Sequence, residues 1–103
     1  MIDGVSDREQ RQLALMQQRL DGFRDSELSI GPVIADLEGL VNALEETPQE
    51  WKDSFVEEWS VLEVAYAVAL DRKQPLPTAR DNDIAAALGA LDALIAEHTG
   101  KRA

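Results

Sequence analysis

Apolar residues recur along this chain at intervals of three and four, the spacing that places them on one face of an α-helix. Four segments show this spacing, over residues 7–23, 31–46, 48–72 and 78–98. No alternation of apolar and polar residues lasts long enough to predict a strand. Because short links favour antiparallel neighbours, the sequence predicts an all-α fold, an antiparallel four-helix bundle. The bundle is expected to form a single domain over residues 1–103, with frayed ends at 1–6 and 100–103.

Residues that start and stop helices support these boundaries. Ser6 and Glu9 have the Ser-x-x-Glu spacing of a capping box, in which each side chain accepts a hydrogen bond from the other residue's amide. Thr47 and Glu50 have the equivalent Thr-x-x-Glu spacing, with Pro48 at the first helical position. The two prolines after the third segment predict a loop, because each disfavours helical backbone at the residue before it.

The third segment is the longest and carries two apolar stripes. The stripe expected to face the core consists of Trp51, Phe55, Trp59, Leu62, Tyr66 and Leu70. Val61, Val64 and Val68 lie on the opposite face, so the second half of this helix is apolar nearly all round. Such a helix is usually buried on every side, either at the centre of a bundle or in an oligomer interface. These three valines are therefore the candidate interface of a homodimer.

Charge is distributed unevenly. The net charge is −10, yet twelve acidic residues lie between Asp25 and Asp71 against one base, Lys52, which gives that segment a charge of −11. This excess argues against nucleic acid and anionic membranes as partners. It indicates either a solvated acidic surface or a docking face for a basic protein. The candidate partner-binding residues are Asp36, Glu38, Glu50, Asp53, Glu57, Glu58, Glu63 and Trp51.

Two of these candidates have two interpretations each. Glu63 projects about 40° from Trp59, within the apolar face of its helix. It is therefore either a structural residue, paired with an arginine or the Tyr66 hydroxyl or left at the rim by a rotation of the helix, or a functional one. In the functional interpretation it lies at the edge of a partner-binding face and contacts a cation on the partner. Trp51 is either a core residue or a partly exposed anchor of an interface.

The residues that catalysis requires are sparse. The chain has no cysteine, and its one histidine, His98, is expected to pack at the end of the bundle. Carboxylates and histidine lack the spacing of a metal site, and no phosphate-binding glycine motif occurs. The sequence therefore predicts a protein that is not an enzyme and has no cofactor or metal. No signal peptide or membrane span is recognisable, so a cytoplasmic location is expected.

Three stretches resemble a known type of small helical bacterial protein. They are Ile34-Ala35-Asp36-Leu37-Glu38-Gly39-Leu40, the Thr-Pro-x-Glu-Trp turn at 47–51, and Glu58-Trp59-x-x-Leu62-Glu63-x-x-Tyr66-Ala67. Over residues 28–72 the chain resembles the immunity proteins that accompany polymorphic and contact-dependent inhibition toxins. The resemblance implies a cytoplasmic protein that occludes a cognate toxin domain, often a basic nuclease. The alternative function is a homodimeric structural or adaptor protein without an inhibitory role.

Overall fold

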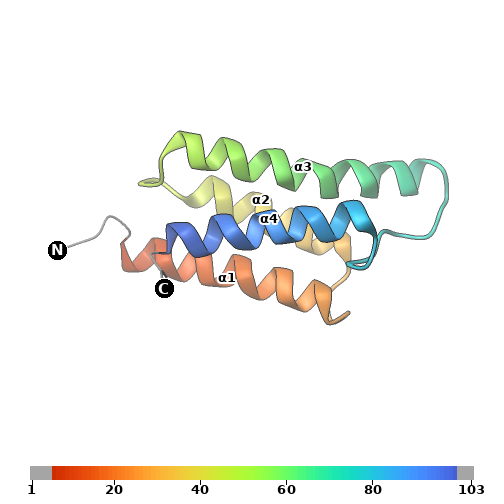
Figure 1. Cartoon of the computed structure of the whole chain (residues 1–103), viewed down its shortest axis with the longest axis horizontal. Coiled ribbons are helices and arrows are strands. Elements are labelled where there is room, and N and C mark those ends of the chain that lie inside the picture. Colours follow the sequence, from red (N-terminus) through yellow and green to blue (C-terminus); the bar gives the residue numbers. More distant parts are fainter. Residues whose placement is uncertain (1–5, 100–103) are drawn as a thin grey trace.

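The computed structural model describes residues 6–99, which form four helices without a strand. The helices are α1 (Asp7–Arg24), α2 (Ile30–Ala43), α3 (Gln49–Asp71) and α4 (Asn82–His98). Each helix packs against its neighbour in the chain, and α4 closes the ring by packing against α1 (Figure 1). The predicted four-helix bundle is therefore confirmed. The frayed ends expected at 1–6 and 100–103 lie outside the described residues, except Ser6, which is the N-cap of α1.

Most core side chains are aliphatic, and apolar residues of α1, α2 and α4 line the core. On α1, Leu13, Met16 and Leu20 have no exposed surface, so this helix is fully docked in the bundle. The other fully or nearly fully buried side chains include Ile30, Val33, Leu37, Phe55, Leu62, Ile84, Leu88 and Leu91. Burying side chains of this size contributes about 1.5–3 kcal/mol each relative to leaving them in water.

Helix α3 departs from the expectation that it is buried on every side. It packs only between α2 and α4, and its C-terminal part extends past the start of α4 (Figure 1). Val64 is 58% exposed, Val68 39% and Leu70 55%. Placing Leu70 in the core was therefore wrong, and α3 is not the central helix, which was one of the two alternatives; the oligomer interface stays a prediction. The sequence pattern shows which residues of α3 are apolar. It does not show how far α2 and α4 extend along α3, and this determines which of those residues are buried.

Some predicted helix boundaries were wrong, mainly where a side chain near the helix end packs or forms hydrogen bonds elsewhere. Helix α2 ends at Ala43 rather than residue 46, because Leu44 is buried and adopts extended backbone angles. Helix α3 begins at Gln49 with Pro48 as N-cap, and no side chain caps it. The predicted Thr47 cap is absent because the Thr47 hydroxyl bonds elsewhere. Helix α4 begins at Asn82 rather than 78, after an irregular loop that contains both prolines.

Two helices end in the same motif, with a left-handed residue that is not glycine. After α1, Ser26 has φ 63°, and the Glu27 amide donates to the Gly22 carbonyl at 2.8 Å. After α3, Lys73 has φ 55°, and the Gln74 amide donates to the Ala69 carbonyl at 2.8 Å. Both are Schellman motifs, which normally use glycine at the left-handed position. A side chain there costs stability because its Cβ crowds the following carbonyl.

We expect Ser26→Gly and Lys73→Gly each to raise the free energy of unfolding by up to about 1 kcal/mol. Glycine adopts the left-handed conformation without the steric cost, and both side chains are exposed, so nothing else is lost. Urea denaturation followed by circular dichroism measures the change. Ser26→Ala is the control and should bring no gain, since it keeps the Cβ. A loss of stability in both glycine variants would contradict the assignment of these motifs.

Candidate functional site

Helix α1 supplies the bases that neutralise its neighbours. Within residues 6–99, every ion pair involves an arginine of α1. Arg19 Nε lies 2.9 Å from Asp36 Oδ2 on α2. Arg24 pairs with Asp92 on α4, which also accepts a hydrogen bond from Gln17 at 2.8 Å. The acidic residues that face α1 are therefore partly compensated, although most of these pairs are exposed and each contributes only about 0–1 kcal/mol.

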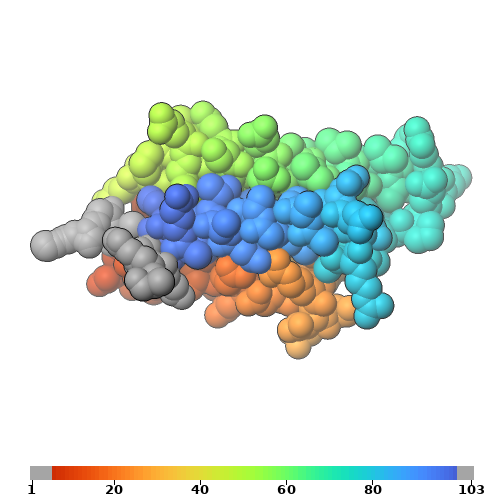
Figure 2. Space-filling model, viewed as in Figure 1, coloured from red at the N-terminus to blue at the C-terminus, as the bar shows by residue number. Residues whose placement is uncertain are grey.

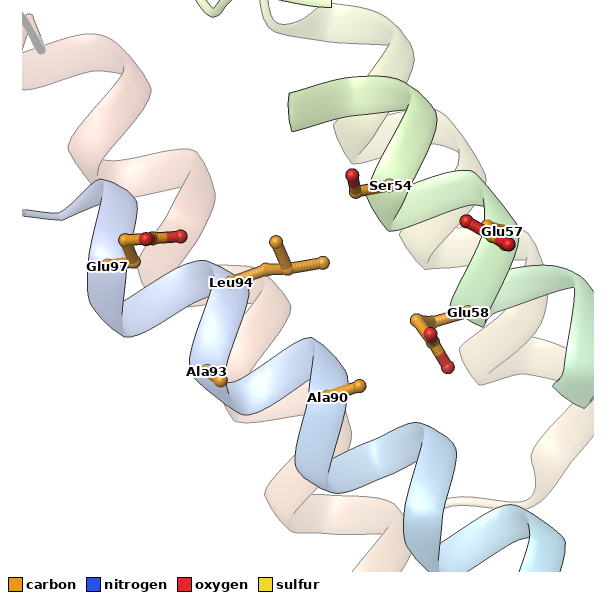
Figure 3. Close-up of a pocket in the computed structure, with 7 residues that line it drawn as sticks. All are labelled: Ser54, Glu57, Glu58, Ala90, Ala93, Leu94 and Glu97. Carbon is orange, nitrogen blue, oxygen red and sulfur yellow. The ribbon is translucent and has the colours of Figure 1, made fainter. Parts of the chain in front are cut away.

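The acidic residues between α3 and α4 have a different environment. A hollow of about 440 Å³ lies between the two helices. Its lining, which we call the acidic groove, consists of Ser54, Glu57 and Glu58 from α3 with Ala90, Ala93, Leu94 and Glu97 from α4 (Figure 3). Glu58 points from α3 toward α4, and Leu94 points from α4 toward α3 (Figure 3). The alanine side chains are small and leave the hollow open, so the carboxylates of Glu57, Glu58 and Glu97 surround an apolar bottom.

No base compensates this groove within the described chain. Neither Glu57, Glu58 nor Glu97 pairs with an arginine or lysine among residues 6–99. Asp53, one turn before Glu57, accepts a hydrogen bond only from the neutral Gln49 side chain, at 2.9 Å. Lys52, which is adjacent to Asp53 in sequence, donates to the Leu44 carbonyl instead. Uncompensated like charges repel one another, so a cation that approaches this face lowers its electrostatic energy.

The structure divides the acidic residues singled out from the sequence. Glu57 and Glu58 line the acidic groove, and Glu50 and Asp53 precede them on α3. Asp36 and Glu38 lie on α2, which does not pack against α4. Glu63 is exposed, which excludes a buried pair and leaves both the rim position and the partner contact open.

Trp51 belongs to the core rather than to an exposed anchor. It is 9% exposed and stacks on Phe55 with 5.3 Å between ring centroids. Its indole N–H donates to the Leu94 carbonyl at 2.9 Å, which ties α3 to α4 beside the acidic groove. Trp51 therefore supports the groove from beneath and is not available as a partly exposed contact.

A second polar cluster closes the end of the bundle where α1 begins and α4 ends. The Glu9 carboxylate, 1% exposed, accepts hydrogen bonds from the Glu45 and Glu46 amides at 2.7 and 2.6 Å. It also accepts from the Thr47 hydroxyl at 2.6 Å. The predicted capping box is thus half correct. The Ser6 hydroxyl accepts from the Glu9 amide at 3.2 Å, but the Glu9 side chain bonds to the α2–α3 turn instead of the Ser6 amide.

His98 completes this cluster in the position that the sequence predicts, at the bundle's end. Its ring packs on Trp51 with centroids 5.1 Å apart, and its Nε2 lies 3.1 Å from the Thr47 hydroxyl oxygen. Because the Thr47 proton is directed at the Glu9 carboxylate, His98 must donate its Nε2 proton to Thr47. His98 is therefore not placed to remove a proton from Thr47, and Thr47 itself is only 6% exposed. The cluster therefore joins the first turn of α1, the α2–α3 turn and the end of α4.

The hydrogen bonds to the Glu9 carboxylate affect its pKa more than its burial does. Burial alone raises the pKa of the Glu9 carboxyl, because it penalises the charged form. The Thr47 hydroxyl, the two turn amides and the positive charge of Arg8 all favour the charged form. Together they lower the pKa of Glu9 below its ordinary value, so the carboxylate is ionised near neutral pH.

Sequence reasoning missed the α4 side of the acidic groove. Ala90, Ala93 and Glu97 are spaced three and four apart, so helical spacing alone places them on one face. Alanine is small enough to let a neighbouring helix approach closely, yet Ala93 is exposed. The missing information was which face of α4 turns toward α3, and that depends on the packing of the whole bundle.

Comparison with protein-family models, curated proteins and solved structures finds no match. Within residues 6–99, no three carboxylate or histidine side chains gather closely enough to hold a metal ion. None of the four described helices combines the length and apolar character needed to cross a lipid bilayer. The case for function therefore rests on the geometry of the chain itself.

Proposed function

We propose that this chain is a non-catalytic protein-binding module whose α3–α4 face occludes a basic partner domain, in the manner of an immunity protein acting on a toxin. The observation that carries the proposal is the uncompensated acidic groove. The arginines of α1 neutralise acidic residues on other faces, whereas Glu57, Glu58 and Glu97 have no basic partner within the described residues. Such a face attracts a cationic surface from a distance and speeds its association.

The support for a rigid binding face comes from the packing beneath it. Trp51 bonds to the Leu94 carbonyl and Phe55 is fully buried, so both helices are fixed where the carboxylates project. A preformed face loses little conformational entropy on binding, which favours tight association. The proposed module needs no cofactor and acts in the cytoplasm, where a toxin that acts on intracellular targets would have to be blocked.

Reversing charge at the groove tests this proposal. The wild-type chain captures its partner from the native host, and the partner is identified and expressed alone. We expect a basic protein that stops bacterial growth, and we expect co-expression of this chain to restore growth. The double variant Glu57→Lys/Glu58→Lys should weaken binding by about 100-fold and abolish rescue. Binding of the wild type should also slow as ionic strength rises.

A matched control separates the groove from overall charge. Glu27→Lys/Glu38→Lys makes the same change in net charge at exposed positions outside the acidic groove. It should retain binding within a few-fold and retain growth rescue. The proposal is wrong if both double variants bind alike, or if the captured protein is neither basic nor toxic.

The competing function is a homodimeric structural or adaptor protein. The 58% exposure of Val64 favours this alternative, because an apolar side chain in that position loses contact with water when a second copy covers it. A pair of chains would, however, bring two copies of the same acidic helix together, each chain with a net charge of −10. Sedimentation velocity at high micromolar concentration distinguishes the two. We expect a monomer, and a stable dimer would favour the adaptor.

A further inference from the structure

The boundary between α3 and α4 carries a second hollow beyond the acidic groove. This second hollow, of about 600 Å³, lies between the C-terminal half of α3, the loop after it and the start of α4. Its apolar wall consists of Val61, Val64, Ala65 and Val68, and Asp81 and Asp83 stand on the opposite rim. Figure 2 shows α3 and α4 side by side on the viewed face, with the end of α3 and its loop extending past α4.

The two hollows follow the same helix boundary one after the other, with no lining residue in common. The acidic groove uses α3 from Ser54 to Glu58, and the second hollow uses α3 from Ser60 to Ala69. At 1.5 Å per residue, the stretch from Ser54 to Ala69 spans about 22 Å, or about four helical turns. We call this combined surface the α3–α4 groove. It has an apolar wall of valines with carboxylates at both ends, and it is long enough for a helix of about 15 residues.

We propose that the α3–α4 groove binds a cationic amphipathic helix of the basic partner. The proposal rests on the proposed function and names the element that this face receives. The wall of valines offers contacts for apolar side chains spaced three and four apart. The carboxylates of Glu57, Glu58 and Glu97 at one end, and of Asp81 and Asp83 at the other, would pair with lysine or arginine on the helix flanks.

Charge complementarity selects this occupant over others. Among residues 6–99, no arginine or lysine lines either hollow, so a cation is favoured along the whole length. An anionic membrane or a second copy of this acidic chain would bring like charge to the same surface. A peptide that binds by strand addition would need the edge of a sheet, and residues 6–99 contain no strand. A helix forms its backbone hydrogen bonds internally, so it contacts the groove with its side chains only.

The probe for this proposal is a synthetic peptide of about 18 residues that places leucines on one face and lysines on the other. Its control has the same composition in an order that forms no apolar face. Calorimetry with the full-length protein should give at least about tenfold tighter binding of the amphipathic peptide. NMR shifts should fall on α3 and α4. Equal affinity for the two peptides, or shifts confined to another face, would overturn the proposal.

Variants then test the apolar end of the groove. Val64→Ser/Val68→Ser should weaken binding of the amphipathic peptide by about tenfold. The control is Val56→Ser/Leu70→Ser, which removes side chains of similar exposure, 42% and 55%, that line neither hollow. This control should bind like the wild type. Equal losses in the two variants would contradict a specific groove, as would a wild-type dimer that Val64→Ser/Val68→Ser converts to a monomer.

The native partner separates this proposal from the proposed function. If toxin binding depends on Glu57 and Glu58 but not on Val64 and Val68, the function stands and the amphipathic helix is wrong. If the peptide binds selectively but the captured host protein is neither basic nor toxic, the groove stands and the inhibitory function is wrong.

Discussion

Replacing Glu9 by alanine is expected to lower the free energy of unfolding by about 3 kcal/mol, because it leaves three donors of the α2–α3 turn without their acceptor. The Glu45 and Glu46 amides and the Thr47 hydroxyl all bond to this one carboxylate. Glu9 is 1% exposed and Thr47 6%, so water has little access to replace the lost bonds. Urea denaturation at neutral pH measures the effect.

Two further variants separate the contributions of the Glu9 cluster. Glu9→Gln keeps one acceptor oxygen and should cost less than Glu9→Ala. Thr47→Val removes the bonds of the hydroxyl to Glu9 and His98 and leaves both turn amides bonded to Glu9. Glu38→Ala removes an exposed carboxylate of α2 and should change stability by no more than about 0.5 kcal/mol. The assignment is wrong if Glu9→Ala costs no more than Glu38→Ala.

The same carboxylate makes stability depend on acid. Because the pKa of Glu9 is lower in the folded chain than in the unfolded chain, its contribution is fully present above the unfolded value of about 4.3. That contribution is lost as the pH falls through the lower folded pKa. The wild type should therefore lose more stability than Glu9→Gln between about pH 5 and pH 2. Parallel acid titrations of the two proteins, followed by circular dichroism, measure the difference.

The helices of this fold could be predicted from sequence because their determinants are local. The spacing of Leu13, Met16 and Leu20 defines a helix face whatever the rest of the chain does. The role of Glu9 could not be predicted in the same way. Its position three residues after Ser6 is the signature of a capping box, but its carboxylate bonds instead to a turn about 36 residues away. Local spacing does not reveal a competing set of donors brought close by the packing of the bundle.

The sequence predicts the negative charge of the candidate site but not its position on the bundle. The excess of acidic residues between Asp25 and Asp71 is visible in the sequence and covers both α2 and α3. Only the three-dimensional arrangement shows that Arg19 on α1 pairs with Asp36, whereas Glu57 and Glu58 face α4. Compensation of charge is a property of neighbours in space. The sequence therefore predicts an acidic protein, and the packing determines which acidic residues remain available.

The largest packing loss that we expect comes from Trp59. Its side chain is 9% exposed, and its indole N–H donates to the Ile34 carbonyl at 3.0 Å, which ties α3 to α2. Trp51 ties α3 to α4 in the same way, through the Leu94 carbonyl. The two tryptophans lie two turns apart on the same core-facing stripe of α3, and thus attach this helix to both of its neighbours. Trp59→Ala removes both the ring and the bond, and should cost about 4 kcal/mol.

Trp59→Phe separates the two contributions. Phenylalanine keeps most of the packing and loses the indole N–H, so we expect a cost of about 1–2 kcal/mol, from the lost hydrogen bond and the smaller ring. Urea denaturation followed by circular dichroism measures both variants, and Trp51→Phe provides the matched indole deletion on the α4 side. Equal costs for Trp59→Phe and Trp59→Ala would mean that the hydrogen bond, rather than the buried ring, holds α3 against α2. A cost below about 1 kcal/mol for Trp59→Ala would contradict the placement of this ring in the core.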